Sequence, residues 1–305
     1  MSKKAQLQMI KCFIFVGLLR ISQLLPYSGR SMLASWIAKK RLEGKSKSVK
    51  TIQKNLQLCY PQITEAHVDS TTYEVLKSYA MLLLEMGIAW FGSKKKTIKL
   101  IHKVEGIEKL NKLYESKKPV IIAVPHIGNW EILWNYLQIN FETTGMYSKD
   151  RNIYFDKIVT KARTRFGGML YATDPRGLKG LLKSLKQGSV LMILPDRAPI
   201  KGSGSYSEIF GQSVYTMTLL HKILQKSGAR LLFADCIRNK NKGFNIRIED
   251  SNEIESITDM NKFNDKMNKK LELIINQNKE QYLWSYERFR KHAKTRKKET
   301  DSNLL

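Results

Sequence analysis

The sequence predicts an α/β protein in which a single sheet is flanked by helices on both faces. Short, nearly continuous apolar runs such as 119–124 and 189–195 are typical of buried strands, and they alternate with segments of helical periodicity such as 174–188. Gly188 and Gly228 follow helical segments, as helix-ending glycines do. Strands that are apolar throughout are covered on both faces, which helices around a parallel sheet achieve.

Residues 31–100 are expected to be helical, because the stretch 71–91 carries an apolar helical stripe without β alternation. Beyond residue 104, helices and strands alternate. The predicted helices are 104–116, 129–139, 152–167, 174–188, 214–228 and 258–279. The predicted strands are 119–124, 144–148, 169–172, 189–195, 229–238 and 243–250. Segment 201–206 is expected to be a flexible loop, and 280–294 a last amphipathic segment.

The chain is strongly basic, with 53 Lys and Arg against 27 Asp and Glu, a formal net charge of +26. Such a charge favours a polyanionic neighbour: nucleic acid, anionic lipid or an acidic protein. No zinc-finger spacing, RNA-binding aromatic signature or basic region joined to heptads accompanies it, so no nucleic-acid partner is expected. The charge is equally consistent with a basic, solvated surface.

The cysteines and the N-terminus suggest a compartment. Cys12, Cys59 and Cys236 are odd in number and far apart, which favours a chain whose cysteines are reduced. They do not have the spacing of metal ligands. No metal and no cofactor is therefore expected. The N-terminus is basic and then apolar, but Lys11 and Arg20 interrupt it well before the about 20 apolar residues that spanning requires. A helix lying in the bilayer interface fits this pattern, and an amphipathic helix packed on the domain is the alternative.

These features divide the chain into three parts. Residues 1–28 are expected to be a membrane-associated N-terminal helix, residues 29–294 the main domain, and residues 295–305 a polar, disordered tail.

The candidate site lies where the strand 119–124 ends and a helix begins. There His126 and Glu131 form an H-x-x-x-x-E pattern, at the kind of strand-to-helix turn where open α/β sheets expose their chemistry. We expect Glu131 to accept the second N–H of the imidazole of His126, so that its other nitrogen acts as a general base. Two residues at this spacing are weak evidence alone, because an incidental histidine before a helix-start glutamate looks the same.

The surrounding motifs strengthen this interpretation. "HIGNWE" at 126–131 resembles the H-x-x-x-x-D/E motif of the bacterial lipid A biosynthesis (lauroyl/myristoyl) acyltransferase family. Four further segments are similar to landmarks of that family and occur in the same order: 161–168, 174–196, 210–218 and 280–291. Two departures stand out. The loop after Asp196 lacks the usual acidic residue, and the closing signature has Glu287 and Arg288 where two basic residues are common.

The resemblance implies a glycerolipid-acyltransferase-like fold and an acyltransferase. The enzyme would move a fatty acyl chain from acyl carrier protein to a hydroxyl of a lipid A precursor, at the cytoplasmic face of the inner membrane. It would need no cofactor, and the anionic membrane surface would be a further partner of the basic chain.

The resemblance also assigns roles to residues. His126, Glu131 and Arg163 are expected to be catalytic: a base, its orienting partner and a donor to the oxyanion. Arg165 is the second candidate for the oxyanion, and binding a phosphate of the glycolipid is the alternative role for either arginine. Asp196 is expected to orient Arg163. Asn129 is expected either to support the turn in a substrate-binding role or to cap the following helix.

Two other functions remain open from the sequence. The altered loop after Asp196 is compatible with an acyltransferase that uses another membrane lipid, such as an aminolipid or a phosphoglycolipid. The charge alone is also compatible with a basic membrane-binding protein that catalyses nothing.

Overall fold

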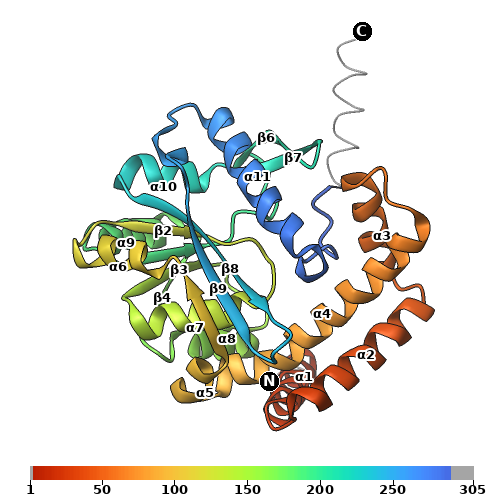
Figure 1. The fold of residues 1–305 in the computed structure, drawn as a ribbon. Helices are drawn as coiled ribbons and strands as arrows, with labels where there is room; N and C mark the ends of the chain where they lie inside the picture. The colour runs from red at the N-terminus through yellow and green to blue at the C-terminus, as the bar shows by residue number, and fades with distance from the viewer. Residues whose placement is uncertain (1–2, 290–305) are drawn as a thin grey trace.

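A computed structural model describes residues 3–289. In this range, five helices come before the first strand. The short α5 (Lys94–Lys99) is the last of them, and the first four are α1 (Lys3–Ser22), α2 (Tyr27–Glu43), α3 (Lys47–Cys59) and α4 (Glu65–Phe91). Figure 1 shows them as an arm along one side of the sheet domain. The long helix α4 begins at Thr64, whose hydroxyl accepts the N–H of His67 at 3.4 Å, and an acidic residue lies in its first turn. The predicted helical character of 31–100 is therefore confirmed.

Seven strands form one sheet, in the order β1-β9-β8-β2-β5-β3-β4. They are β1 (Ile101–Glu105), β2 (Val120–Ala123), β3 (Thr143–Tyr147), β4 (Met169–Ala172), β5 (Val190–Ile193), β8 (Arg230–Arg238) and β9 (Phe244–Asp250). The pairs are parallel except β8 with β9, which is antiparallel. The sheet is thus mostly parallel, as the apolar strands predict.

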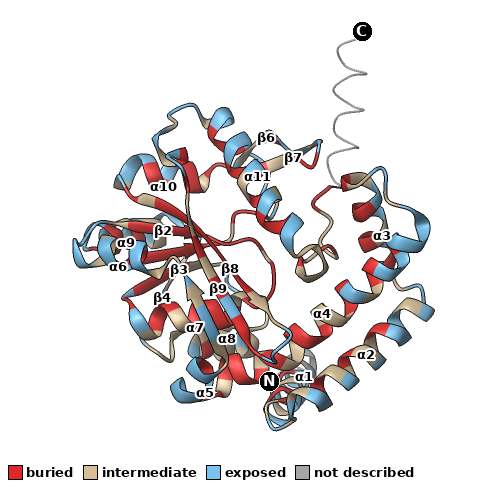
Figure 2. Ribbon diagram, viewed as in Figure 1, coloured by how far each residue is buried: buried red, intermediate tan, exposed pale blue. Residues whose placement is uncertain are grey.

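Helices cover both faces of this sheet, so the predicted fold class is confirmed in this respect. Along β2, Ile121 and Ala123 pack into one core, while Val120 and Ile122 pack into the other. The first core is covered mainly by α3, α9 (Pro175–Lys186), α10 (Leu219–Ser227) and α11 (Met260–Gln277). The second is covered by α4, α6 (Ile107–Glu115), α7 (Trp130–Asn140) and α8 (Ile153–Thr164). Figure 2 shows the buried strands between more exposed helices.

Three local expectations were wrong. Segment 101–105, at the edge of the sheet, is strand β1, and its mixed exposure explains why no apolar run marks it. The expected loop at 201–206 and the expected helix start at 214 instead form an antiparallel hairpin, β6 (Gly204–Ile209) and β7 (Gln212–Met217). The hairpin packs on α11, a tertiary contact that stabilises strands where local periodicity does not.

The N-terminal helix α1 packs on the domain with one face and exposes another. Cys12 and Leu19 are buried, and α1 approaches α4 so closely that a Cβ on Gly87 would lie 2.0 Å from the carbonyl oxygen of Leu19. Phe13 and Leu18 are exposed. Between residues 3 and 289, no helix is both long enough and apolar enough to cross a bilayer. Association of α1 with a membrane therefore stays a prediction.

The expected division at residue 28 falls in the first turn of α2, and α1 and α2 both pack against α4. Two short 3₁₀ helices flank α11: Ile254–Ser256 before it and Lys279–Gln281 after it. After Gln281 the chain continues without regular structure to Phe289. The tail predicted at 295–305 lies outside the described residues.

Candidate active site

The site forms where two neighbouring parallel strands end. Ala123 of β2 pairs with Ile193 of β5, and each strand is followed within three residues by a side chain able to titrate: His126 and Asp196. Because the carboxyl ends of parallel strands lie at one edge of the sheet, these two residues meet although 70 positions separate them.

Asp196 holds His126 with both carboxylate oxygens. Oδ1 lies 2.6 Å from Nδ1 of the imidazole, and Oδ2 accepts the backbone N–H of His126 at 2.8 Å. Burial by itself raises the pKa of Asp196, but the charge and hydrogen bonds of His126, with the charge of Arg288, outweigh it and lower the pKa to about 2. An ionised carboxylate accepts Nδ1–H, which leaves Nε2 as the proton-accepting nitrogen.

The expected pairing of Glu131 with His126 is therefore wrong in this structure. The carboxylate of Glu131 is buried and accepts Nε–H of Arg163 at 3.1 and 3.2 Å, a second contact from Nη2 of Arg163, and the indole N–H of Trp90 at 3.1 Å. Glu131 is the second residue of α7, and its side chain points toward α4 and α8, which carry these donors.

The expectation that Asp196 orients Arg163 is corrected at the same time. The two carboxylates have exchanged the predicted partners: Asp196 holds the histidine and Glu131 holds the arginine. Burial alone raises the pKa of Glu131, yet the charge and hydrogen bonds of Arg163 lower it below its usual value. In turn, burial lowers the pKa of Arg163, and Glu131 raises it further than burial lowers it. Both groups are ionised.

His126 and Arg163 open onto one cavity of about 590 Å³. Its wall is mostly apolar and comes from α4, α7, α8 and the ends of β3 and β5. The apolar residues that line it include Met86, Trp90, Trp134, Met146, Phe155, Val159, Leu170, Met192 and Leu194. Parts of the stretches 81–91 and 131–137 thus line a cavity beside His126, in addition to contributing core residues. Four further charged residues also line the cavity: Glu131, Asp150, Asp156 and Arg197.

Arg165, expected to bind substrate, lies away from this cavity. Its guanidinium donates to the carbonyl oxygens of Ala89, at 2.9 Å, and of Gly92, and it stacks on the Phe166 ring at 3.8 Å. These carbonyls belong to the end of α4, where a cation complements the helix dipole. Burial lowers the pKa of Arg165 to about 10. The side chain joins α4 to the end of α8.

Asn129, the other expected substrate-binding residue, is fully buried and caps α7. Its side-chain oxygen accepts the N–H of Ile132 at 3.1 Å, and its amide donates to Glu85 at 3.0 Å. Glu85 also binds Arg238 through two hydrogen bonds of 2.7 and 2.6 Å. Glu85 and Arg238 were missed in the sequence because neither lies near a motif with a recognisable spacing.

The turn that carries His126 is fastened to the C-terminal segment. Leu283 donates its backbone N–H to the carbonyl oxygen of His126 at 3.0 Å, and Gly128 donates to that of Gln281 at 3.0 Å. Gly128 has φ +59°, and a Cβ there would lie 2.0 Å from the carbonyl oxygen of Cys236. The glycine in "HIGNWE" is therefore required by both conformation and close approach.

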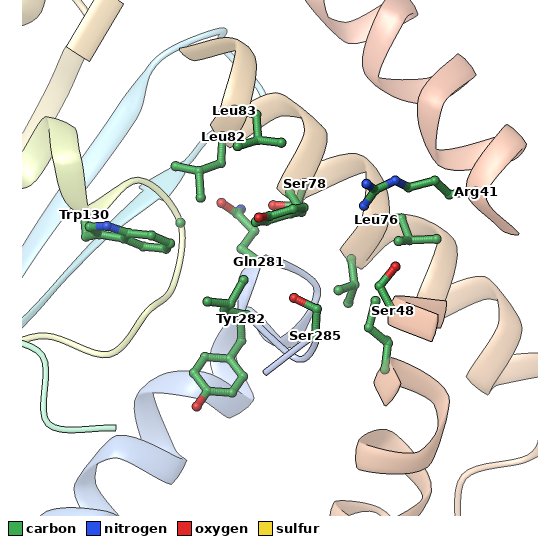
Figure 3. A pocket seen from close by; sticks show the side chains of 15 residues that line it. Arg41, Ser48, Leu76, Ser78, Leu82, Leu83, Trp130, Gln281, Tyr282 and Ser285 are labelled. Atoms are coloured by element: carbon green, nitrogen blue, oxygen red, sulfur yellow. The ribbon is translucent and has the colours of Figure 1, made fainter. Parts of the chain in front are cut away.

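A second cavity of about 330 Å³ lies on the other side of Trp130 (Figure 3). It is bounded by α3, α4, the turn at Gly128 and the C-terminal segment, and its wall mixes leucines with serines and Arg41. Trp130 lines both cavities, and its ring meets that of His126 edge-on, with centroids 5.0 Å apart. In the described part of the chain, no group of three or more metal-ligating side chains comes together.

The chain is similar to known proteins of one family. A family model described as bacterial lipid A biosynthesis acyltransferase matches residues 1–291. The lipid A biosynthesis lauroyltransferase of Escherichia coli K12 is 25% identical over 277 residues, 90% of each chain. The palmitoleoyltransferase of the same organism is 27% identical over 241 residues, 78% of this chain and 77% of that one. Its myristoyltransferase is 23% identical over 235 residues, 75% and 71% of the two chains.

Proposed function

Because this chain belongs to the bacterial lipid A biosynthesis acyltransferase family and is an acyltransferase, we propose that it transfers a fatty acyl chain from acyl carrier protein to a hydroxyl of a lipid A precursor. One observation carries the mechanism. His126, held through Nδ1 by an ionised Asp196, faces the same cavity as Arg163. That cavity is largely apolar, as the tail of a fatty acyl group requires.

The proposed reaction begins with proton transfer. Nε2 of His126 takes the proton of the acceptor hydroxyl as its oxygen attacks the carbonyl carbon of the thioester. The tetrahedral intermediate then collapses: the carbon–sulfur bond breaks, and His126 returns the proton to the leaving thiolate. The products are an ester on the acceptor and a free thiol on the carrier. Asp196 keeps the productive tautomer and stabilises the transient imidazolium.

Arg163 is the proposed donor to the oxyanion. Its Nε and Nη2 are held by Glu131, which fixes the guanidinium plane beside the cavity. A positioned, charged donor is worth more inside a largely apolar cavity than in water. In this arrangement Glu131 acts through Arg163 and not through the histidine.

The two substrates are both amphipathic, so each needs an approach to His126. The larger cavity suits the acyl chain of the donor, and the second cavity reaches the same turn, where Trp130 lines both cavities. The chain has 53 basic and 27 acidic residues, and this positive charge favours binding of both an acidic carrier protein and a phosphorylated glycolipid. The loop after Asp196, where Arg197 stacks over Tyr286 at 4.6 Å, is the place where a different acceptor lipid would be selected.

The proposed location is the cytoplasmic face of the inner membrane. Helices α1 and α2, with the turn between them, expose a set of large apolar side chains that we call the apolar face. It comprises Leu7, Ile10, Phe13, Ile14, Leu18, Ile21, Leu24, Met32 and Trp36. Exposed basic residues, including Lys11, Arg20 and Lys39, lie on the same helices. Apolar side chains among basic ones are typical of helices that lie in an anionic bilayer interface.

An acyl-transfer assay tests the proposal. Wild type, His126→Ala and the surface control His67→Ala would be incubated with acyl carrier proteins loaded with several chain lengths and with a lipid A precursor. Mass spectrometry would detect the added acyl mass. We expect product from wild type and the control, and a loss of about 10²–10⁴-fold in His126→Ala. Parallel reactions offer an aminolipid or a phosphoglycolipid as acceptor. Product only in these reactions would reassign the acceptor, and no product with any acceptor would contradict catalysis.

A further inference from the structure

Tyr282 lies directly behind the carboxylate that holds the histidine. It follows the 3₁₀ turn at Lys279–Gln281, and its backbone pairs with Ile127, next to His126. The side chain is buried, and its hydroxyl lies close to Asp196 and Arg288. Figure 3 shows its ring directed away from the second cavity, with the hydroxyl at the far end. Burial raises the pKa of Tyr282 well above its ordinary value, so the phenol stays protonated beside Asp196.

Arg288 is a buried cation beyond this tyrosine, with only 1% of its surface exposed. Its Nη2 donates to Oδ1 of Asn268 in α11 at 3.0 Å. The amide of Asn268 donates in turn to Ser207 and Thr216 of the β6–β7 hairpin, at 2.8 and 3.0 Å. Its neighbour Glu287 lies near the surface and pairs with Lys47 at 3.4 Å. The acidic replacement in the closing signature therefore falls on the outer position, and the buried position keeps its arginine.

We propose that Tyr282 and Arg288 are positioning residues for the catalytic base, forming a chain Arg288–Tyr282–Asp196–His126 that orients and ionises the carboxylate. The proposal rests on the acyl transfer proposed above. Tyr282 lines the second cavity, but its hydroxyl points away from it, and Arg288 lines neither cavity; both residues act through Asp196. Through these four side chains, the closing segment 280–289, the hairpin and α11 are connected to the turn that carries His126.

The physical argument has two parts. Oδ1 of Asp196 binds the imidazole of His126 and Oδ2 binds its backbone N–H, and the protonated Tyr282 phenol lies beside this carboxylate, where it restricts its movement. A buried carboxylate without compensating charge tends to take up a proton, and the Arg288 guanidinium opposes this.

The sign of the pH effect follows from this arrangement. Removing either the hydroxyl or the guanidinium leaves more uncompensated negative charge at Asp196, which favours the protonated imidazole. The acid limb of the pH profile of kcat/KM should therefore move to higher pH. The other charged groups that face the site from the cavity wall are unchanged in these variants: Glu131, Arg163, Asp150, Asp156 and Arg197.

The first experiment compares Tyr282→Phe with Tyr60→Phe. The phenol of Tyr60 bonds Asn276 at 2.6 Å at the surface, and its ring packs against Trp284 in the same aromatic cluster. We expect Tyr282→Phe to lower kcat about tenfold, with KM changed less than twofold and the acid limb moved to higher pH. Tyr60→Phe should match wild type. An unchanged kcat and an unmoved limb in Tyr282→Phe would overturn the proposal, as would a loss that only follows the fraction of folded protein.

The second experiment uses the charge of Arg288. Arg288→Met removes it, and Arg288→Lys keeps it on a side chain of similar length. We expect the acid limb to move in the methionine variant and to stay in place in the lysine variant. Thermal denaturation of both variants reports folding separately. A limb that moves equally in both variants, or in neither, contradicts a role for the charge.

A third measurement separates this proposal from the proposed function. In protein labelled with ¹⁵N-histidine, the Nδ1–H signal of His126 is identified by its loss in His126→Ala. We expect Tyr282→Phe to shift this signal and Tyr60→Phe to leave it, whether or not the chosen substrates react. If wild type forms no acyl product, acyl transfer fails while the shift still supports the chain. If the product forms but the signal does not shift, the positioning role of Tyr282 is contradicted while the acyl-transfer proposal stands.

Discussion

At the scale of single residues, the site depends on which carboxylate each cation meets. His126 and Arg163 each face one ionised acid, Asp196 and Glu131, and neither acid is shared. Both carboxylates are almost fully buried, so each would be costly without its partner. In the proposed mechanism, this separation lets one pair move a proton while the other keeps a fixed positive charge near the cavity.

This division predicts different results for two isosteric variants. In Asp196→Asn the side-chain oxygen still accepts the backbone N–H of His126, but the amide NH₂ faces Nδ1 and forces the tautomer in which Nε2 carries the proton. We expect kcat/KM to fall about 10³-fold with little change in the melting temperature. In Glu131→Gln we expect a loss of about 2 kcal/mol in the free energy of unfolding, because Arg163 loses its counter-charge, and a smaller loss of activity, about tenfold.

Steady-state kinetics and urea denaturation of the two purified variants check this prediction. If Glu131→Gln were the less active of the two, and Asp196→Asn stayed within threefold of wild type, Glu131 would be the partner of the base after all.

At the scale of elements, the turn between β2 and α7 must be held in place for His126 to reach Asp196. The turn is tied to β8 through Asn129, whose N–H donates to Cys236 at 2.8 Å, and to the C-terminal segment through Gly128 and Leu283. Glu85 of α4 connects the cap residue Asn129 to Arg238 at the end of β8. Elements from both ends of the chain therefore position one histidine.

Gly128→Ala tests this close packing. The new Cβ would meet the carbonyl oxygen of Cys236, so the turn must move away from β8 in addition to adopting a strained backbone. Gly228→Ala is the matched control, with a similar φ of +62° and open space around the added atom. We expect the control to lose about 1 kcal/mol and Gly128→Ala to lose about 2–3 kcal/mol and most of its activity. Urea denaturation midpoints measure the loss of stability. Equal losses of stability in the two variants would contradict close packing at Gly128.

At the scale of the whole molecule, charge and apolar surface favour the same kind of neighbour. The chain carries a net charge of +26, and the apolar face lies on two helices that both pack against α4. Each basic residue close to an anionic membrane contributes about 1 kcal/mol of attraction, and the apolar side chains add burial in the interface.

Sedimentation with vesicles that contain phosphatidylglycerol tests this docking. Trp36, 59% exposed on α2, is changed to Asp; Leu273, 51% exposed on α11, receives the same change as a control. We expect Trp36→Asp to weaken binding about tenfold, the control to have little effect, and added salt to weaken binding of all forms. Equal binding of the vesicles by both variants would show that the apolar face does not contact the membrane.

Much of this architecture follows from the sequence. Apolar runs with helical segments between them predict a covered sheet, and the stretch "HIGNWE" places a histidine at the end of β2. Local pattern was insufficient at the edge strand β1, which is only half covered, and at the β6–β7 hairpin, which depends on packing against α11.

The carboxylate that pairs with His126 was decided by the tertiary structure alone. Glu131 is five residues from His126, but its position in α7 directs it toward Trp90 and Arg163. Asp196 is 70 residues away and reaches the imidazole because β2 and β5 are neighbours whose ends coincide. The sequence by itself determined the family, the fold class and the histidine, since these depend on local patterns and motifs. Which charges meet depends on strand order and helix direction, and only the folded chain brings those together.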